Sequence, residues 1–183
     1  MRIKKLHQEY NIELSYTLFP LHPYIPDEGI TIKELFKDRN IDIEGAQKQL
    51  KVLMEKEGLE YGLRSMTYNS RLAQELAKWA DLQPGGQSIH DVLYRTYFVE
   101  GHNLADIEIL VSIAGSLQLD EREARDVLEN RRFSASIDAD WQRCRQLKIV
   151  AVPTYLCKEK KLVGAQTFEA LEKLVVSRGA VRK

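Results

Sequence analysis

Apolar residues recur every three or four positions along most of the chain, which is the period of an amphipathic α-helix. The pattern predicts a helix end at 2–9, helices near 32–39, 42–57, 70–80, 87–99, 105–116, 120–130 and 134–147, and a last helix that begins near Phe168. Thr31 followed by Glu34 has the spacing of a capping box, which favours a helix start at this point. Most of the chain is therefore expected to be helical.

Two regions follow the two-residue period of a β-strand instead. Residues 12–19 alternate apolar and polar side chains and end against Pro20, which predicts a strand. Residues 149–157 form a run rich in β-branched side chains, and residues 162–163 form a second short strand after a charged turn. The second region therefore predicts a β-hairpin.

The order of these elements predicts an interrupted domain. A lone strand followed by a long helical block before its sheet partners implies that the block is inserted between two halves of one α/β domain. We therefore expect residues 1–30 and 149–183 to form the α/β domain, and residues 31–148 to form an all-helical insertion domain. The length of 183 residues is ample for a buried core.

Charge and composition narrow the classes of partner. The chain has 27 basic and 27 acidic residues, so it lacks the net positive field of a nucleic-acid-binding protein. No apolar run reaches the length of a membrane helix, and no secretory signal follows Lys4 and Lys5. We expect a cytoplasmic protein without nucleic-acid or membrane partners. The sequence leaves a homodimer open.

The cysteines and histidines do not form a recognisable site. Cys144 and Cys157 are too few for a disulfide framework and too far apart for a Cys-x-x-Cys pair. The four histidines show no helical metal-ligand spacing, so no metal site is expected. Cys144 falls in an apolar helical stripe, where a cysteine is usually inert packing.

Several segments resemble the DsbA-like group of the thioredoxin superfamily, particularly FrnE-type oxidoreductases. The resemblance is carried by the segments Phe19–Pro23, Asn69–Ala73, Leu93–Gly101, Val152–Thr154 and Leu162–Gln166. Related families are the 2-hydroxychromene-2-carboxylate isomerases and the kappa-class glutathione transferases. The resemblance implies an α/β, thioredoxin-like fold with a large helical insertion.

The resemblance also implies a substrate site. In such families a cis-proline, here Pro153, precedes a strand, and the backbone of Val152 would pair with an extended peptide or with glutathione beside Thr154. The turn Gly164-Ala165-Gln166 would hold the γ-glutamyl end of glutathione, although a capping turn without a ligand is an equal alternative. Asn69 is a further candidate contact, but a helix N-cap explains it more simply.

The family's first strand and its Cys-Pro-x-Cys turn are expected before Arg2, so no catalytic residue is assigned in this chain. Three interpretations stay open. The first is a protein disulfide oxidoreductase or isomerase that acts on protein thiols without a cofactor. Under this interpretation the chain alone would be inactive. The second is a glutathione-dependent isomerase or transferase, and the third is a non-catalytic peptide-binding module.

The resemblance finally predicts a gap in the sheet. In the family fold the first strand lies between the strand at 12–19 and the strand at 154–157. We therefore expect these two segments not to pair directly. The gap would be filled by residues before Met1 or by a strand from a second copy, and direct pairing would instead indicate a rewired domain.

Overall fold

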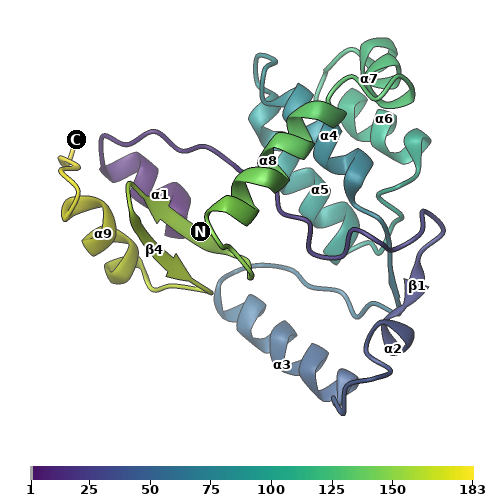
Figure 1. Cartoon of the computed structure of the whole chain (residues 1–183), viewed down its shortest axis with the longest axis horizontal. Helices are drawn as coiled ribbons and strands as arrows, with labels where there is room; N and C mark the ends of the chain where they lie inside the picture. Colours follow the sequence, from purple (N-terminus) through teal and green to yellow (C-terminus); the bar gives the residue numbers. More distant parts are fainter. Residues whose placement is uncertain (1) are drawn as a thin grey trace. The chain divides into compact units, whose positions relative to one another are not determined.

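The computed structural model describes residues 2–183, which fall into two compact units. The first unit comprises the chain up to Leu21 together with Asp140–Lys183, and the second comprises His22–Ala139. These limits differ from those expected from the sequence, which lie after residues 30 and 148. In chain order the elements are α1 (Arg2–Glu9), β1 (Ile30–Thr31), α2 (Ile32–Leu35), α3 (Ile43–Lys56), β2 (Met66–Thr67), α4 (Arg71–Ala80), the 3₁₀ turn η1 (Gly86–Ser88), α5 (Ile89–Phe98), α6 (Ile107–Ser116), α7 (Glu121–Glu129), α8 (Ser134–Gln146), β3 (Thr154–Cys157), β4 (Lys160–Val163) and α9 (Phe168–Val176) (Figure 1).

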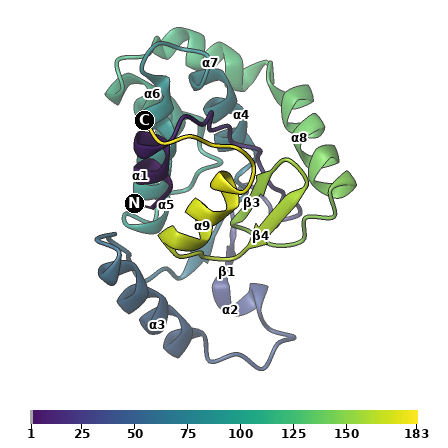
Figure 2. The same ribbon diagram turned by 90° about the vertical axis from the view of Figure 1, so that its left-hand side faces the viewer.

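The first unit is built on the packing of α1 against α9. Leu6 and Tyr10 from the start of the chain bury themselves against Leu171 and Val175 near its end. Tyr155 of β3 packs on the same cluster, which attaches the hairpin to the two helices. Figure 2 shows α9 lying beside the hairpin. The first and last segments of the chain therefore form a shared core.

The predicted strand at residues 12–19 is wrong. The structure has no regular element between Asn11 and Pro20, and Tyr16 is 44% exposed. Leu18 N–H donates to a carboxylate oxygen of Asp140 at 2.8 Å rather than to a strand. The alternating pattern is present in the sequence, but a strand also needs a neighbouring ladder, and none lies beside this segment within residues 2–183.

The predicted hairpin is confirmed, with different limits. β3 pairs antiparallel with β4, with Thr154 opposite Val163 and Cys157 opposite Lys160. The strand begins at Thr154, because residues 149–153 follow an irregular path up to Pro153. Within the described residues β3 pairs with β4 alone. The segment 12–19 and β3 do not pair directly, as expected.

The second unit is a helical cluster with one apolar core. α4 carries an apolar stripe whose members Leu76, Ala77 and Ala80 are almost completely buried against α5, α6 and α7. The predicted helices of this block are confirmed, and Thr31 caps α2 by accepting from Glu34 N–H at 3.0 Å. α2 ends at Leu35, four residues earlier than expected.

Two very short strands in this unit were not foreseen. β1 and β2 pair antiparallel, with Ile30 opposite Thr67 and Thr31 opposite Met66. Each has two residues, which is too short to produce an alternating pattern in the sequence.

A buried ionic cluster ties α4 to the start of α8. The carboxylate of Glu75 is fully buried and binds Arg131 through contacts of 2.6 to 3.2 Å and Arg71 at 3.1 Å. Arg71 also donates to the Ser134 carbonyl and to Asp138. The hydrogen bonds that Arg131 donates to the Glu75 carboxylate raise the pKa of Arg131, so the arginine keeps its charge. The burial of one carboxylate thus depends on two guanidinium groups.

We predict that Glu75→Gln destabilises the protein by about 1–3 kcal/mol, because Arg131 and Arg71 lose a charged acceptor while Arg71 keeps its bond to Asp138. The measurement is urea unfolding followed by circular dichroism. Glu108→Gln is the matched control, since Glu108 pairs with Arg125 at 2.6 Å on an exposed surface. Equal losses for the two variants would contradict the role given to Glu75.

Candidate functional site

Six of the seven residues predicted for the site lie together at one end of the hairpin. The carbonyl of Pro153 accepts a hydrogen bond from Gly164 N–H at 2.8 Å. This bond places the segment 152–154 beside the segment 164–166. Residues ten to fourteen positions apart in the sequence therefore form one local surface.

Val152 presents a backbone without an internal partner. Its side chain is 46% exposed, and neither its N–H nor its C=O bonds to another backbone group within residues 2–183. A residue that precedes proline is restricted to extended conformations, which is the geometry of a strand. The Val152–Pro153 peptide bond is cis. Val152 thus lies two residues before β3 with its backbone groups unpaired within residues 2–183.

The backbone groups on the outer edge of β3 are also unpaired within residues 2–183. In an antiparallel ladder alternate residues bond inward, and the bond between Pro153 and Gly164 fixes which ones do so. Tyr155 and Cys157 then face β4, whereas the backbone groups of Thr154 and Leu156 point outward. The Thr154 hydroxyl donates to the Ala151 carbonyl at 2.6 Å and holds the approach to the strand.

The turn from β4 to α9 is held by its own side chains. Gly164 has φ +83°, a left-handed conformation that glycine adopts without strain. Gln166 donates from its side-chain amide to the Val163 carbonyl at 2.8 Å, and the Gln166 carbonyl accepts from Arg2 at 2.5 Å. Ala165 lies between them and is exposed.

The first turn of α9 already carries an anion. Thr167 caps the helix by accepting from Ala170 N–H at 3.2 Å. The pKa of Glu169 is lowered, first by hydrogen bonds from its own backbone N–H and from the Thr167 side chain. The positive charges of Arg2 and Lys5 lower it further. Part of the donor capacity of this helix start is therefore used internally. The sequence analysis missed Arg2 and Glu169, although an acidic residue in the first helical turn is a readable signal.

Asn69, the seventh candidate, lies in the second unit and has a structural role there. Its side-chain oxygen accepts from Arg71 N–H at 2.9 Å, and its amide donates to the Ile25 carbonyl at 2.9 Å. The side chain thus holds the start of α4 and the preceding loop together.

Family comparison gives this geometry its context. Residues 1–176 match the sequence model of the DSBA-like thioredoxin domain. The chain belongs to this family. The expected thioredoxin-like fold is thereby confirmed. The hairpin end described above lies within the part of the chain that matches the DSBA-like domain.

Individual proteins are also similar to this chain. The protein YwbO of Bacillus subtilis strain 168 is 25% identical over 135 residues, which cover 70% of this chain and 66% of the relative, just under two thirds of its length. A probable DsbA oxidoreductase of Streptomyces coelicolor has a TM-score of 0.78 at 25% identity, over 87% of this chain and 72% of that chain. A 2-hydroxychromene-2-carboxylate isomerase has a TM-score of 0.68 at 16% identity, over 97% and 85%, a likeness of fold alone.

The two cysteines of this DSBA-like chain lie in different environments. Cys144 is 3% exposed on α8, with its thiol 3.7 Å from the Leu18 carbonyl. Burial, followed by the charge of Asp140, raises the pKa of the Cys144 thiol. Cys157 is half-buried at the end of β3. The two residues are far apart in sequence, and neither belongs to a Cys-x-x-Cys pair.

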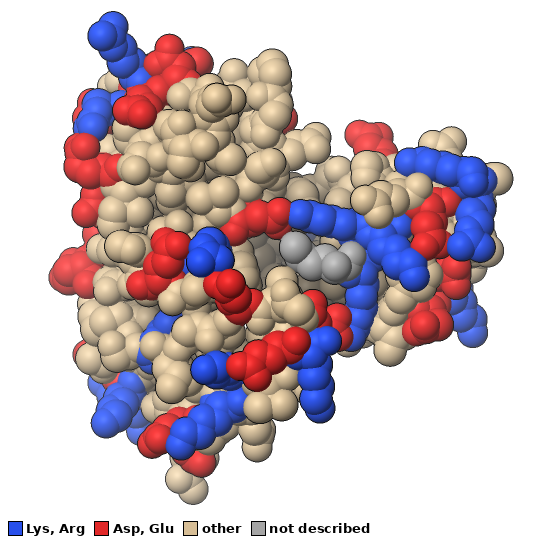
Figure 3. Space-filling model, turned by 180° about the vertical axis from the view of Figure 1, so that it is seen from behind, with Lys and Arg blue, Asp and Glu red and all other residues tan. Residues whose placement is uncertain are grey.

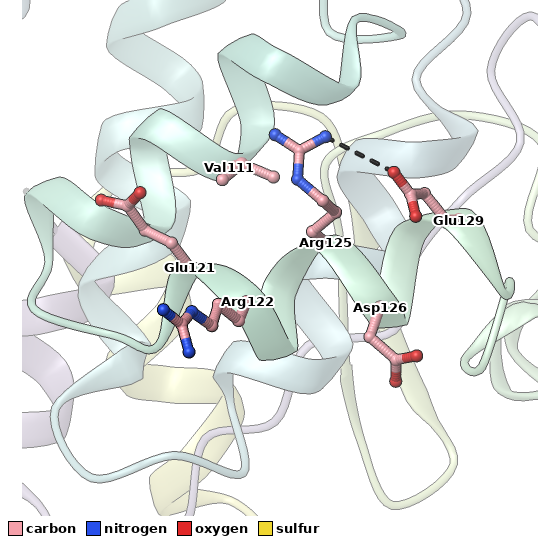
Figure 4. Close-up of a pocket in the computed structure, with 6 residues that line it drawn as sticks. All are labelled: Val111, Glu121, Arg122, Arg125, Asp126 and Glu129. Carbon is pink, nitrogen blue, oxygen red and sulfur yellow. Dashed lines mark hydrogen bonds and ion pairs between the residues drawn. The ribbon is translucent and has the colours of Figure 1, made fainter.

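Outside the hairpin end, the DSBA-like chain has a hollow of about 280 Å³ on α6 and α7. The hollow is lined by Val111 and charged side chains, and its Arg125 pairs with Glu129 at 3.4 Å (Figure 4). On the face drawn in Figure 3, basic and acidic side chains are interspersed.

Among residues 2–183 no group of His, Cys, Asp or Glu is arranged for a metal ion. The described helices include none that is long and apolar enough to cross a bilayer.

We predict that iodoacetamide modifies Cys157 at least about tenfold faster than Cys144 at pH 8, because the thiolate is the reactive form and Cys144 is buried with a raised pKa. Mass spectrometry of timed digests measures both rates. In guanidinium chloride the two rates should become similar. Faster modification of Cys144 in the folded chain would refute its assignment as a packing residue.

Proposed function

We propose that this chain holds extended polypeptide substrates for thiol–disulfide chemistry, through the backbone of Val152 and the adjoining edge of β3. The function is that of a protein disulfide oxidoreductase or isomerase of the DSBA-like family, with protein thiols or disulfides as substrates. The observation that carries the proposal is the exposed position of Val152, two residues before β3, with its backbone groups unpaired within residues 2–183.

Physical chemistry supports this choice of ligand. An extended peptide can satisfy unpaired strand groups by adding its own backbone to the edge, and such pairing is independent of most side chains. That tolerance suits a protein that acts on many polypeptides. The neighbouring Gly164 exposes no side chain that would block the approach.

Glutathione is the second candidate ligand, with isomerisation or transfer as the chemistry. The turn Gly164-Ala165-Gln166 and the N-terminus of α9 support it, because helix starts favour carboxylates. Glu169 weighs against it, since its own carboxylate occupies that helix start. A non-catalytic peptide-binding module would share the Val152 edge with the first candidate.

We predict that a short extended peptide with one cysteine binds saturably and shifts the amide resonances of Val152 and Thr154. Val152→Pro removes one N–H donor and should weaken binding about two- to tenfold, the value of one net hydrogen bond. Val150→Pro is the matched control, because Val150 is 86% exposed and lies outside the proposed contact. Circular dichroism checks that both variants fold.

Other outcomes separate the alternatives. Shifts confined to Gly164, Ala165 and Gln166 on addition of glutathione would favour the glutathione-dependent function. Peptide binding without any effect on the rate of disulfide exchange would favour the non-catalytic module. Peptide binding that is equally strong in Val152→Pro would contradict the proposed contact.

A further inference from the structure

The helix α3 carries an apolar surface that its own unit does not cover. None of its 14 residues is buried. Leu50, Val52 and Leu53 are exposed by 37%, 50% and 58%. An isolated helix of this length is only marginally stable in water, so contact with another surface would stabilise it. Lys48, Gln49, Val52 and Leu53 also line a hollow of about 460 Å³.

One side of α3 is already used. The side chain of Gln47 bonds the backbone of Arg64 in both directions, at 2.8 and 3.0 Å. Leu59 N–H also bonds the Met54 carbonyl at 2.9 Å. These bonds tie the Gln47 side of the helix to the segment that follows it.

The apolar stripe lies on a different side. Ala46, Leu50 and Leu53 are separated by four and three residues, which aligns them along one face. Gln47 lies about 100° around the helix from Ala46, so the tether does not cover this stripe. Asp42 and Lys56 flank the same edge of the stripe at its two ends.

We propose that α3 packs antiparallel against α3 of a second copy along the stripe of Ala46, Leu50 and Leu53. The stripe is self-complementary in this direction, because Ala46 of one copy faces Leu50 of the other while Leu53 lies over the opposite helix start near Ile43. The inference is independent of the proposed function, since it uses none of the hairpin residues.

The charges at the two ends of α3 favour a second copy as the partner and an antiparallel arrangement of the two helices. A twofold axis between antiparallel helices brings Asp42 of each copy beside Lys56 of the other, which gives two opposite-charge pairs. A parallel arrangement would keep Asp42 and Lys56 at opposite ends of the interface and would form neither of these pairs. Asp42 uses one oxygen to cap Gly45 N–H at 3.0 Å and has a second oxygen to offer. The chain has no net charge to oppose association.

The contact is small. Two four-turn helices bury less surface than the roughly 1,200–2,000 Å² of a stable interface, so the dimer should dissociate on dilution. Sedimentation equilibrium of the full chain tests this. The apparent mass should rise from 21.1 kDa toward twice that value as concentration increases.

Variants locate the interface. Leu53→Glu and Lys56→Glu should each weaken the dimer about tenfold or more, the first by placing a charge in the stripe and the second by opposing Asp42. Adding Asp42→Asn to Lys56→Glu should recover part of the loss, because asparagine still caps the helix but is uncharged. Lys51→Glu, on the opposite side of α3, is the control and should leave the association unchanged.

Far-UV circular dichroism verifies that the variants keep their helices. A chain that stays monomeric up to about 1 mM would overturn the proposal, and so would a dimer that Leu53→Glu and Lys56→Glu leave intact. Recovery in the double variant is the result that a merely structural role of α3 would not produce.

Discussion

A β-strand has two hydrogen-bonding edges, and β3 meets a partner within the described chain along only one of them. An unpaired backbone group is costly if it is buried, so an open strand edge is tolerated only where water or another chain can reach it. The properties of the hairpin end follow from this constraint. The backbone of Val152 is free, the Thr154 and Leu156 groups point outward, and the Leu156 side chain is 36% exposed.

Packing of one face of the hairpin against α1 and α9 explains how its open edge can persist. Tyr155 packs into the cluster of Leu6, Tyr10, Leu171 and Val175, so one face of β3 is anchored by apolar burial. Tyr10 adds a hydrogen bond from its hydroxyl to Glu172 at 2.6 Å. The hairpin is thus held by α1 and α9 and does not depend on a second strand neighbour for its position. A positioned but open edge is well suited to receive an extended chain.

The sequence predicted the parts of the fold that depend on local rules. The capping box of Thr31 and Glu34 and the stripe of α4 could be read directly, because each involves residues less than a few turns apart. The strand at 12–19 failed because alternation shows only which faces a strand would have, while the ladder depends on a distant partner. Glu75 sits beside the apolar positions Leu72 and Leu76, so a buried carboxylate could have been suspected. Its partner Arg131 is 56 residues away and could not be read from periodicity.

The candidate site was predictable only through family resemblance. Nothing in the spacing of Val152 and Gln166 alone brings them together, whereas the hairpin register does so through Pro153 and Gly164. Amide hydrogen exchange followed by NMR tests this central feature most directly. The account predicts fast exchange at Val152, Thr154 and Leu156 and slow exchange at Tyr155, with Val152 becoming protected when an extended peptide is added. Slow exchange at Val152 and Thr154 in the free chain would show that the edge is already paired and would contradict the account.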